Sequence, residues 1–325
     1  MLKFLIVGFG SMGRRHFENL KQIENVEVSI LTRRHLDLPD TKVYSSLEET
    51  SPEGFDAVFI TNETALHIPT AIAFAERRCN LFIEKPLSNS LEGVDRLTSL
   101  ISKYNLKVMI GCNMRFHPVV CLVKDFVQND KIGRIISARV EAGGYLPDWH
   151  PGRDYRDSYS ASKEKGGGVI LDLIHELDYA YWFFGEASKV FCFSGKRSNL
   201  QIETEDMAEI LLDFQSGTLC EVHLDYVQRY PSRSFGLIGT EGVIQADLIA
   251  NKVKVFEASK GEWEVFDLGS SFARNKMYID EVRHYIDYIY GLLPQPLINL
   301  EDGIKVLQMA LAAKESSLVG RVIQV

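Results

Sequence analysis

Three ionisable side chains have the types and positions that acid–base chemistry requires. A short apolar run at residues 81–83 leads through Glu84 to Lys85 and predicts a buried strand, and the ends of such strands in an open α/β sheet are where ligands bind. Asp172 and His175 are three residues apart in a segment that is apolar almost all round, which predicts one buried helix over residues 169–184 with both side chains on one face. Buried ionisable groups need partners or a cleft. The alternative is a solvated lysine and two satisfied core residues.

The elements that position these side chains begin at the N-terminus. Residues 2–7 and 26–31 predict strands, and residues 14–23 between them predict a helix. The turn after the first strand has glycines at a spacing that suits a tight turn, a close approach to a pyrophosphate and helix–strand packing. The turn consists of Gly8, Phe9, Gly10, Ser11, Met12 and Gly13. We therefore expect a dinucleotide to bind the N–H groups of the following helix. The alternative is a glycine-rich turn that binds no ligand.

The end of the second strand indicates which dinucleotide is bound. An NAD-binding fold usually has Asp or Glu there, whose carboxylate accepts from the ribose hydroxyls. This chain has Thr32, Arg33 and Arg34 instead, and a guanidinium suits a 2′-phosphate. The site chemistry favours NADP(H), with NAD(H) possible. The alternative is that both arginines belong to a solvated loop.

A third strand, predicted at residues 57–60, leads into Thr61 and Asn62, and His67 precedes a helix predicted at residues 69–77. These side chains flank the same sheet edge, so we expect them near the dinucleotide. Asn62 also suits a turn position, and His67 also suits a surface position before a helix.

The motifs together resemble a known family. GFGSMG at the first turn, TNETALH after a later strand and EKP at residues 84–86 resemble the family of glucose-fructose oxidoreductase, inositol dehydrogenase and the rhizopine-catabolism proteins (Gfo/Idh/MocA) in order and spacing. The resemblance continues through Arg115 and Phe116, residues 132–135, the glycines at 166–168 and residues 238–242. It covers essentially the whole chain.

This resemblance implies a fold and a set of contacts. The fold is an N-terminal Rossmann domain with a doubly wound parallel sheet, at residues 1–120, and a C-terminal α+β domain with an open, mostly antiparallel sheet, at residues 121–325. The second domain is expected to bind substrate and form oligomers. The dinucleotide contacts are expected at the glycine turn, Thr32, Arg33, Arg34, Thr61, Asn62, His67, Glu84, Lys85 and Arg115.

The pattern beyond residue 120 agrees with such a second domain. Strands are predicted one after another without intervening helices, which favours an antiparallel meander. They cover residues 135–142, 189–194, 207–214, 218–226, 234–239, 243–246, 252–256 and 262–266. Two long helices are predicted at residues 276–292 and 300–318.

In the family, an Asp and a His follow a glycine-rich turn, and Asp172 and His175 match them. The family spacing is four residues, whereas here it is three. The resemblance implies hydride transfer between nicotinamide and a sugar or polyol carbinol. His175 is the expected acid/base, Lys85 orients the hydroxyl and stabilises alkoxide, and Asp172 holds the imidazole or accepts from a neighbouring hydroxyl. All three are also expected to contact substrate.

The predicted loop at residues 143–165 is where substrate identity is expected to be read. It offers aromatic faces and planar hydrogen-bonding groups, including Trp149 and Arg153, which suit carbohydrate. Arg153 and Arg156 also suit a carboxylate or phosphate. The loop and the helix after it resemble family members associated with bacterial surface sugars, including nonulosonic acids. The alternative is a packed structural loop.

Composition excludes several partners and ligands. The net charge of −8, without a basic stripe, argues against nucleic acid, and no apolar run approaches the roughly 20 residues of a membrane span. Five cysteines without metal-ligand spacing support neither zinc nor a disulfide framework, so no metal is expected. We expect a cytoplasmic protein, and the family resemblance implies that the open sheet face is covered in a homodimer or homotetramer.

Two other functions stay open. Some relatives with this fold bind dinucleotide as regulators without turnover, although the presence of Lys85, Asp172 and His175 argues against that here. Others reduce non-sugar substrates such as biliverdin or dihydrodiols.

Overall fold

The computed structural model describes residues 1–50, 54–269 and 272–325, which divide into two compact units. Unit 1 comprises Met1–Asn113 and Asn275–Ile304, and unit 2 comprises Met114–Arg274 and Lys305–Val325. The chain therefore returns to unit 1 near its C-terminus. This differs from the single boundary expected at residue 120, because a helix distant in sequence packs on the first sheet.

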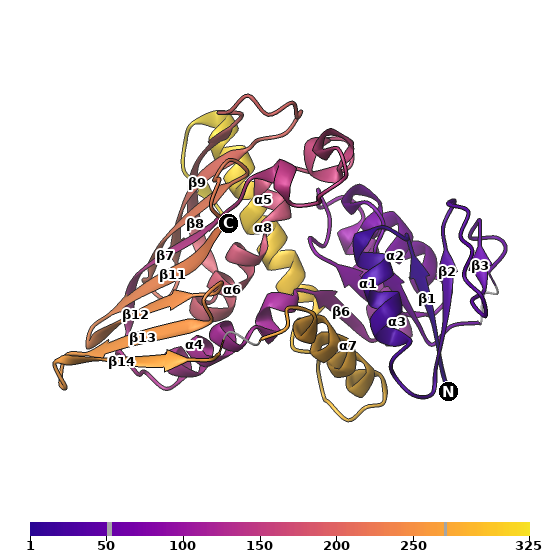
Figure 1. Cartoon of the computed structure of the whole chain (residues 1–325), viewed down its shortest axis with the longest axis horizontal. Helices are drawn as coiled ribbons and strands as arrows, with labels where there is room; N and C mark the ends of the chain where they lie inside the picture. The colour runs from indigo at the N-terminus through magenta and orange to yellow at the C-terminus, as the bar shows by residue number, and fades with distance from the viewer. Residues whose placement is uncertain (51–53, 270–271) are drawn as a thin grey trace. The chain divides into compact units, whose positions relative to one another are not determined.

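Unit 1 is built on a six-stranded parallel sheet with the order β3-β2-β1-β4-β5-β6 (Figure 1). The strands are β1 (Leu2–Val7), β2 (Val26–Leu31), β3 (Val43–Tyr44), β4 (Ala57–Ile60), β5 (Asn80–Glu84) and β6 (Val108–Gly111). The order reverses at β1 and β4. Ligands of doubly wound sheets bind outside the carboxyl ends of the strands near that reversal.

Among the described residues, four α-helices belong wholly to unit 1: α1 (Ser11–Leu20), α2 (His67–Ala75), α3 (Val94–Tyr104) and α7 (Asn275–Ile289). The buried side chains of Phe59 on β4 and Phe82 on β5 stack with ring centroids 4.7 Å apart. His16 of α1 and Tyr285 of α7 pack against these two rings. One sheet face is therefore covered by α1 and α7.

Unit 2 is built on a nine-stranded sheet with the order β14-β13-β12-β11-β7-β10-β9-β8-β15. Its strands are β7 (Ile135–Gly143), β8 (Ala187–Gly195), β9 (Met207–Phe214), β10 (Leu219–Asp225), β11 (Ser232–Gly239), β12 (Gly242–Asp247), β13 (Lys252–Glu257), β14 (Glu262–Asp267) and β15 (Ile323–Gln324). All neighbours are antiparallel except β7 and β10. The sheet is thus mostly antiparallel as expected. It is not a simple meander, because β7 is inserted between β10 and β11.

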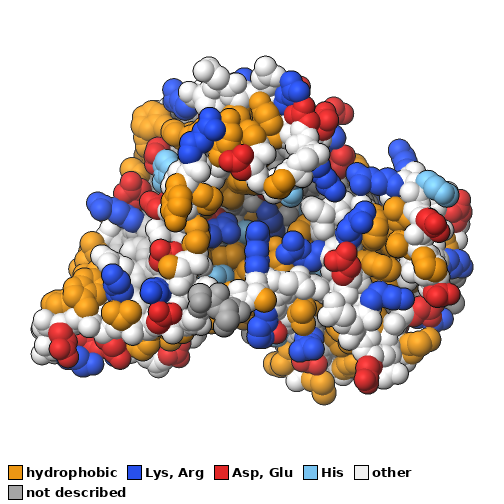
Figure 2. All heavy atoms as spheres, viewed as in Figure 1, with side chains coloured by type: hydrophobic (Ala, Val, Ile, Leu, Met, Phe, Trp, Pro, Cys, Tyr) orange, Lys and Arg blue, Asp and Glu red, His pale blue; other side chains and the backbone are white. Residues whose placement is uncertain are grey.

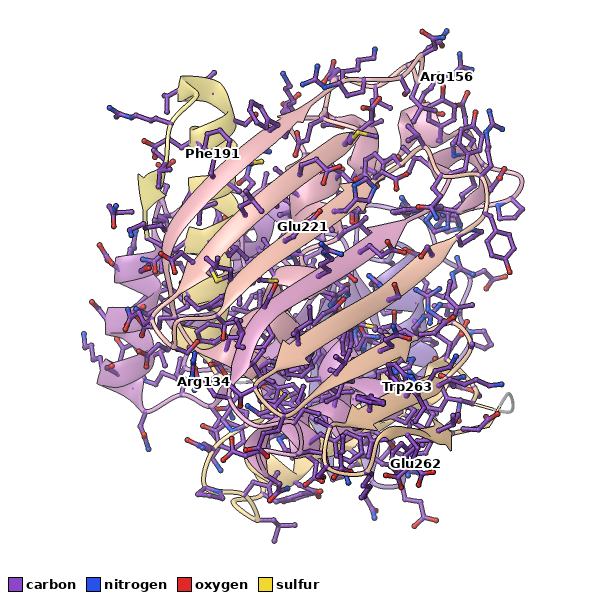
Figure 3. The ribbon with its side chains drawn as sticks, turned by 90° about the vertical axis from the view of Figure 1, so that its left-hand side faces the viewer. Arg134, Arg156, Phe191, Glu221, Glu262 and Trp263 are labelled. Atoms are coloured by element: carbon purple, nitrogen blue, oxygen red, sulfur yellow. The ribbon has the colours of Figure 1, made fainter. Side chains whose placement is uncertain are left out.

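The helices of unit 2 lie on one face of this sheet, and the other face is open to solvent, as Figure 3 shows from the open side. They are α4 (Pro118–Gln128), α5 (Val169–Asp172), α6 (His175–Phe184) and the part of α8 (Leu300–Val319) from Lys305 onward. Along β10 the residues alternate, with Cys220, Val222 and Leu224 buried and Glu221 exposed. The open face therefore carries the outward half of each strand's side chains.

Charged side chains of both signs are interspersed on the face drawn in Figure 2. No helix among the described residues is long and apolar enough to cross a membrane. The same residues contain no cluster of three or more His, Cys, Asp or Glu side chains placed to hold a metal ion.

Candidate active site

The glycine turn between β1 and α1 is closed on one side and open on the other. Gly8 has φ +90°, and a Cβ there would lie 2.7 Å from the Asn62 backbone. A Cβ on Gly13 would lie 2.1 Å from the Gly8 carbonyl oxygen and 2.7 Å from Thr61 Oγ1. A Cβ on Gly10 would meet nothing within 4 Å. Two glycines thus allow close packing of strand and helix, whereas Gly10 leaves open space.

The N-terminus of α1 faces this open space with its backbone donors available. Gly10 is the N-cap residue, and no side chain caps the helix. Uncapped N–H groups and the helix dipole bind anions well. The turn therefore fits a dinucleotide pyrophosphate.

The end of β2 carries the predicted cofactor-selecting residues. Thr32 Oγ1 accepts from the backbone N–H of Arg34 at 3.2 Å, and Arg34 Nη1 donates to the Phe9 carbonyl oxygen at 3.3 Å. Arg33 and Arg34 are both exposed. Arg34 is thereby held against the glycine turn, while Arg33 projects into solvent.

Asn62 and His67 are engaged within unit 1. Asn62 Nδ2 donates to Thr70 Oγ1 at 2.9 Å. His67 is buried, with Nδ1 2.8 Å from the Pro86 carbonyl oxygen and Nε2 3.2 Å from the Asn62 carbonyl oxygen. Burial lowers the pKa of His67, although both carbonyl contacts oppose the shift. His67 therefore connects the ends of β4 and β5, and both its ring nitrogens are occupied by the protein.

Lys85 follows β5 at the same sheet edge and is half-buried. The carboxylate of Glu84 before it is buried inside unit 1, where one oxygen accepts from His16 Nε2 at 2.6 Å and the other accepts from the Lys85 backbone N–H at 3.2 Å. Glu84 is an expected dinucleotide contact, and in the structure its carboxylate oxygens accept from these two partners. The strand end thus presents Lys85 and keeps Glu84 inside.

In unit 2 the predicted single helix over residues 169–184 is wrong. It is interrupted between α5, which ends at Asp172, and α6, which begins at His175, because Leu173 has φ −92° and ψ +34°. The two side chains therefore do not lie on one continuous helical face, and angles based on 3.6 residues per turn do not apply between them. Both residues are buried.

Asp172 is held by three hydroxyl groups. Its carboxylate accepts from Ser160 Oγ at 2.6 Å, from Tyr226 Oη at 3.0 Å and from Tyr159 Oη. Burial raises the pKa of Tyr226 well above its usual value, so its hydroxyl remains a donor. Asp172 therefore ties the loop at residues 144–165 to the end of β10.

Two buried ion pairs surround α6 and were not recognised from the sequence. Arg115 donates to Asp178 through Nε at 3.0 Å and Nη2 at 2.8 Å. Arg233 donates to Glu176 at 2.7 and 3.1 Å. Arg115, an expected dinucleotide contact, is 2% exposed and forms its bidentate pair within unit 2. No local pattern marks these pairs, since each joins residues more than 50 positions apart.

The two predicted substrate-loop residues have different environments. Trp149 packs edge-on against Tyr226, with ring centroids 5.3 Å apart, whereas Arg153 is exposed. Arg156 pairs with Asp154 and donates to Gln201 at 3.0 Å. Trp149 thus contacts the group of side chains around Asp172.

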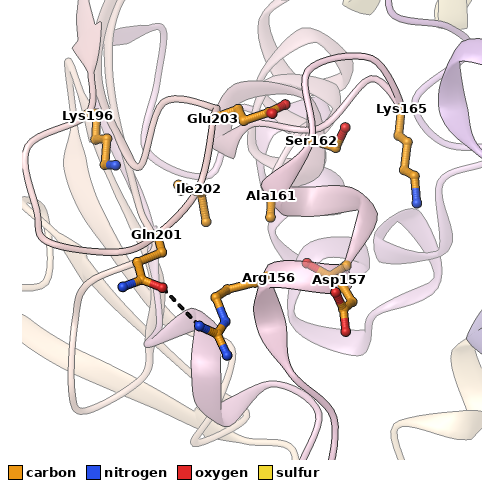
Figure 4. A pocket seen from close by; sticks show the side chains of 10 residues that line it. Arg156, Asp157, Ala161, Ser162, Lys165, Lys196, Gln201, Ile202 and Glu203 are labelled. Atoms are coloured by element: carbon orange, nitrogen blue, oxygen red, sulfur yellow. Dashed lines mark hydrogen bonds between the residues drawn. The ribbon is translucent and has the colours of Figure 1, made fainter.

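The same loop and the connection from β8 to β9 form a polar cavity of about 700 Å³ (Figure 4). Its charged lining residues are Arg156, Asp157, Lys165, Lys196 and Glu203. In Figure 4 the Arg156 and Gln201 side chains point toward one another at one side of this cavity.

Comparison with known proteins identifies both parts of the chain. Residues 2–112 match the oxidoreductase family with an NAD-binding Rossmann fold, and residues 120–245 match the GFO/IDH/MocA C-terminal domain. The chain is 28% identical to the myo-inositol 2-dehydrogenase of Thermotoga maritima, over 96% of this chain and 95% of that one. It is 23% identical to the 2,7-anhydro-N-acetylneuraminate hydratase of Escherichia coli K12, over 76% of this chain and 68% of that one.

Solved structures share the fold. Levoglucosan dehydrogenase in complex with NADH superposes with a TM-score of 0.87 at 21% identity, covering 100% of this chain and 99% of that one. At this identity the likeness concerns the fold. Together with the matched families, the glycine turn and the two sheets, it shows that the chain belongs to the GFO/IDH/MocA family of oxidoreductases.

Proposed function

We propose that this protein is an NAD(P)-dependent dehydrogenase that acts on a CH–OH group of a sugar or polyol. The observation that carries the proposal is the edge of the unit 1 sheet, where an uncapped helix N-terminus opens at Gly10 and Lys85 follows β5. Relatives named for inositol and levoglucosan oxidation support the substrate class.

The bound nicotinamide supplies hydride acceptance, and the side chains move the proton. Lys85 orients the substrate hydroxyl, and its charge stabilises the developing alkoxide. His175 takes the hydroxyl proton as general base and returns it in the reverse reaction. Asp172 accepts from hydroxyl donors of the loop and of Tyr226, which follows β10, so we assign it the role of holding that loop against the substrate.

The test is Lys85→Ala, compared with Lys103→Ala as a control on the exposed side of α3. Lys85→Ala is expected to lower kcat by about 10²–10⁴-fold while leaving the dinucleotide Kd nearly unchanged. The substrates are myo-inositol, scyllo-inositol, levoglucosan and 2,7-anhydro-N-acetylneuraminate, each with NAD⁺ and NADP⁺. Wild-type activity that survives in Lys85→Ala would remove Lys85 from the chemistry.

The same assay separates the two other functions. Dinucleotide binding without turnover of any candidate would favour a non-catalytic regulator. Turnover confined to biliverdin or a dihydrodiol would favour a reductase of non-sugar substrates.

For the dinucleotide we infer a preference for NADP(H), with NAD(H) as the weaker ligand. The end of β2 offers Thr32, Arg33 and Arg34 and no carboxylate, which suits a 2′-phosphate. Arg33→Ala is expected to weaken NADP⁺ binding by about tenfold and to leave NAD⁺ binding unchanged. Titration of both dinucleotides decides, and tighter binding of NAD⁺ by the wild type would overturn the preference.

For the substrate we infer a sugar with several hydroxyl groups or an acidic sugar such as a nonulosonic acid. The loop at residues 144–165 places Trp149 beside Tyr226, and an aromatic face suits a sugar ring. The relative named for 2,7-anhydro-N-acetylneuraminate supports the acidic alternative. Arg153, which is exposed on this loop, would meet the carboxylate.

We further infer a cytoplasmic homodimer or homotetramer that associates through the open face of the nine-stranded sheet. That face carries exposed apolar side chains on several strands, among them Phe193, Leu211 and Leu219. Covering it with a second copy would remove this apolar area from water.

A further inference from the structure

His16 is a buried histidine in unit 1 that lies among aromatic side chains. The ring is fully buried in α1, with ring centroids of Phe59, Phe82 and Tyr278 between 5.1 and 6.4 Å away. A buried polar ring surrounded by aromatic side chains costs free energy unless it makes a hydrogen bond. Its presence there points to a specific partner.

That partner is Glu84, the residue before Lys85. His16 Nε2 lies 2.6 Å from Glu84 Oε1, while Nδ1 has no hydrogen-bond partner among the described residues. An ionised carboxylate can only accept, so this hydrogen bond is made by a proton on Nε2. All the hydrogen bonding of this ring is therefore directed to Glu84.

Glu84 also contacts the backbone of Lys85, so the hydrogen bond from His16 helps to fix that backbone. Its other oxygen accepts from the Lys85 N–H at 3.2 Å. Space for the carboxylate comes from Gly111, its register partner on β6, where a Cβ would lie 3.3 Å from Glu84 Cδ and 2.9 Å from the Phe82 ring. His16, Glu84 and the Lys85 N–H thus form a continuous chain through the interior of unit 1.

A second histidine holds the other side of Lys85. His67 Nδ1 lies 2.8 Å from the Pro86 carbonyl oxygen, one residue after Lys85. His16 comes from the helix that starts at the glycine turn, and His67 starts the helix after β4. The backbone at Lys85 is therefore connected to α1 and α2, two of the helices that begin at this sheet edge.

We propose that His16, acting through Glu84, is a positioning residue that sets the place of Lys85 relative to the glycine turn. The proposal rests on the function proposed for Lys85. Misplacement of a reacting group by about 1 Å can lower a rate by about 100-fold. Loss of the His16 hydrogen bond is therefore expected to lower kcat and to spare ground-state binding.

The first experiment compares His16→Phe, which keeps the ring volume, with His16→Gln, whose amide can donate to Glu84 from a position similar to that of Nε2. His16→Phe is expected to lower kcat by about 10–100-fold with KM and dinucleotide Kd changed less than about threefold, and His16→Gln to recover most of the loss. Equal losses in both variants, or a loss confined to KM, would overturn the proposal.

The second experiment tests whether His16 acts through Glu84. In a double-mutant cycle with Glu84→Leu, which removes both acceptor oxygens, the loss of kcat in the double variant is expected to equal that of Glu84→Leu alone within about twofold. Multiplying losses would show that His16 acts independently of Glu84. His284→Phe is the control, because it removes a histidine of the same unit whose Nε2 accepts from the Leu297 N–H, and it is expected to lower thermal stability without changing kcat.

The third experiment needs no substrate and separates this inference from the proposed function. Amide hydrogen exchange at Lys85, followed by mass spectrometry of its peptide, is expected to be about tenfold faster in His16→Phe and close to wild type in His16→Gln. Unchanged exchange would overturn the positioning role. If exchange is faster in His16→Phe but the wild-type protein oxidises none of the sugars, the positioning role of His16 stands and the proposed function is wrong.

Discussion

The protonation of individual histidines in this protein depends on their surroundings, as His117 and His223 show. His117 caps α4, where its Nδ1 accepts from the Val119 N–H at 3.2 Å. Burial lowers the pKa of His117 to about 4, and the positive charge of Arg233 contributes in the same direction. His223 has the opposite shift, because its hydrogen bond to Asp225 raises its pKa to about 9, aided by Glu209. The same residue type thus serves as a neutral cap in one place and as a cation in another.

The pKa of His117 predicts how stability depends on pH. The folded protein binds this proton only near pH 4, while the unfolded chain binds it near pH 6.5, so stability falls as the pH falls from about 6.5 to 4. His117→Asn keeps a capping acceptor that does not titrate. It is expected to reduce the loss of unfolding free energy between pH 7.5 and 5, measured by urea denaturation. The exposed His35→Asn is the control, and an unchanged loss in His117→Asn would contradict the assignment.

At the scale of elements, the turn between β1 and α1 separates structural glycines from a ligand-facing one. Gly13 has no room for a Cβ beside the Gly8 carbonyl oxygen, whereas Gly10, with φ −81°, has open space around it. The break between α5 and α6 is a second decisive feature, because it sets the directions of Asp172 and His175 independently. The role of each glycine depends on the atoms that surround it in the folded chain, and the break between α5 and α6 is likewise a property of the folded chain.

The contrast between the two glycines gives a test at this scale. Gly13→Ala is expected to lower the unfolding midpoint and to weaken dinucleotide binding, because α1 must shift from β1. Gly10→Ala is expected to fold with wild-type stability and still to weaken dinucleotide binding by about tenfold or more, because its methyl group enters the space of the pyrophosphate. Calorimetric titration and thermal unfolding measure the two quantities. Normal dinucleotide affinity in Gly10→Ala would place the ligand elsewhere.

At the scale of the whole molecule, the open face of the unit 2 sheet exposes apolar side chains to solvent in a single copy of the chain. Phe193 and Leu211 are 60% and 56% exposed on neighbouring strands, and a hollow of about 650 Å³ lies along the central strands of the sheet. An ion pair between Arg139 and Glu221, at 3.3 Å, crosses from β7 to β10 on this face. Mixed apolar and charged groups suit contact with another protein surface.

The expected assembly is testable by mass. The wild type is expected to sediment as a dimer or tetramer of the 36.8 kDa chain, and Leu211→Glu is expected to shift it toward the monomer without unfolding it. Leu292→Glu, at an apolar residue 71% exposed in unit 1, serves as the control. A wild-type protein that sediments as a monomer at micromolar concentration would overturn the assembly.

The sequence by itself determined the elements whose signals are local. Strands β2, β4 and β9 have the predicted bounds, and the glycine turn was recognised because periodicity, turn residues and helix starts act over a few neighbours. Lys85 was found for the same reason, as a charge at the end of an apolar run. The tertiary structure alone decided the insertion of β7 beside β10, the return of α7 to unit 1 and the interruption before His175. It also decided that Arg115 and Glu84 are directed to Asp178 and His16. Such pairings join residues more than 60 positions apart, and their free energy comes from burial and hydrogen bonds that exist only once the chain has folded.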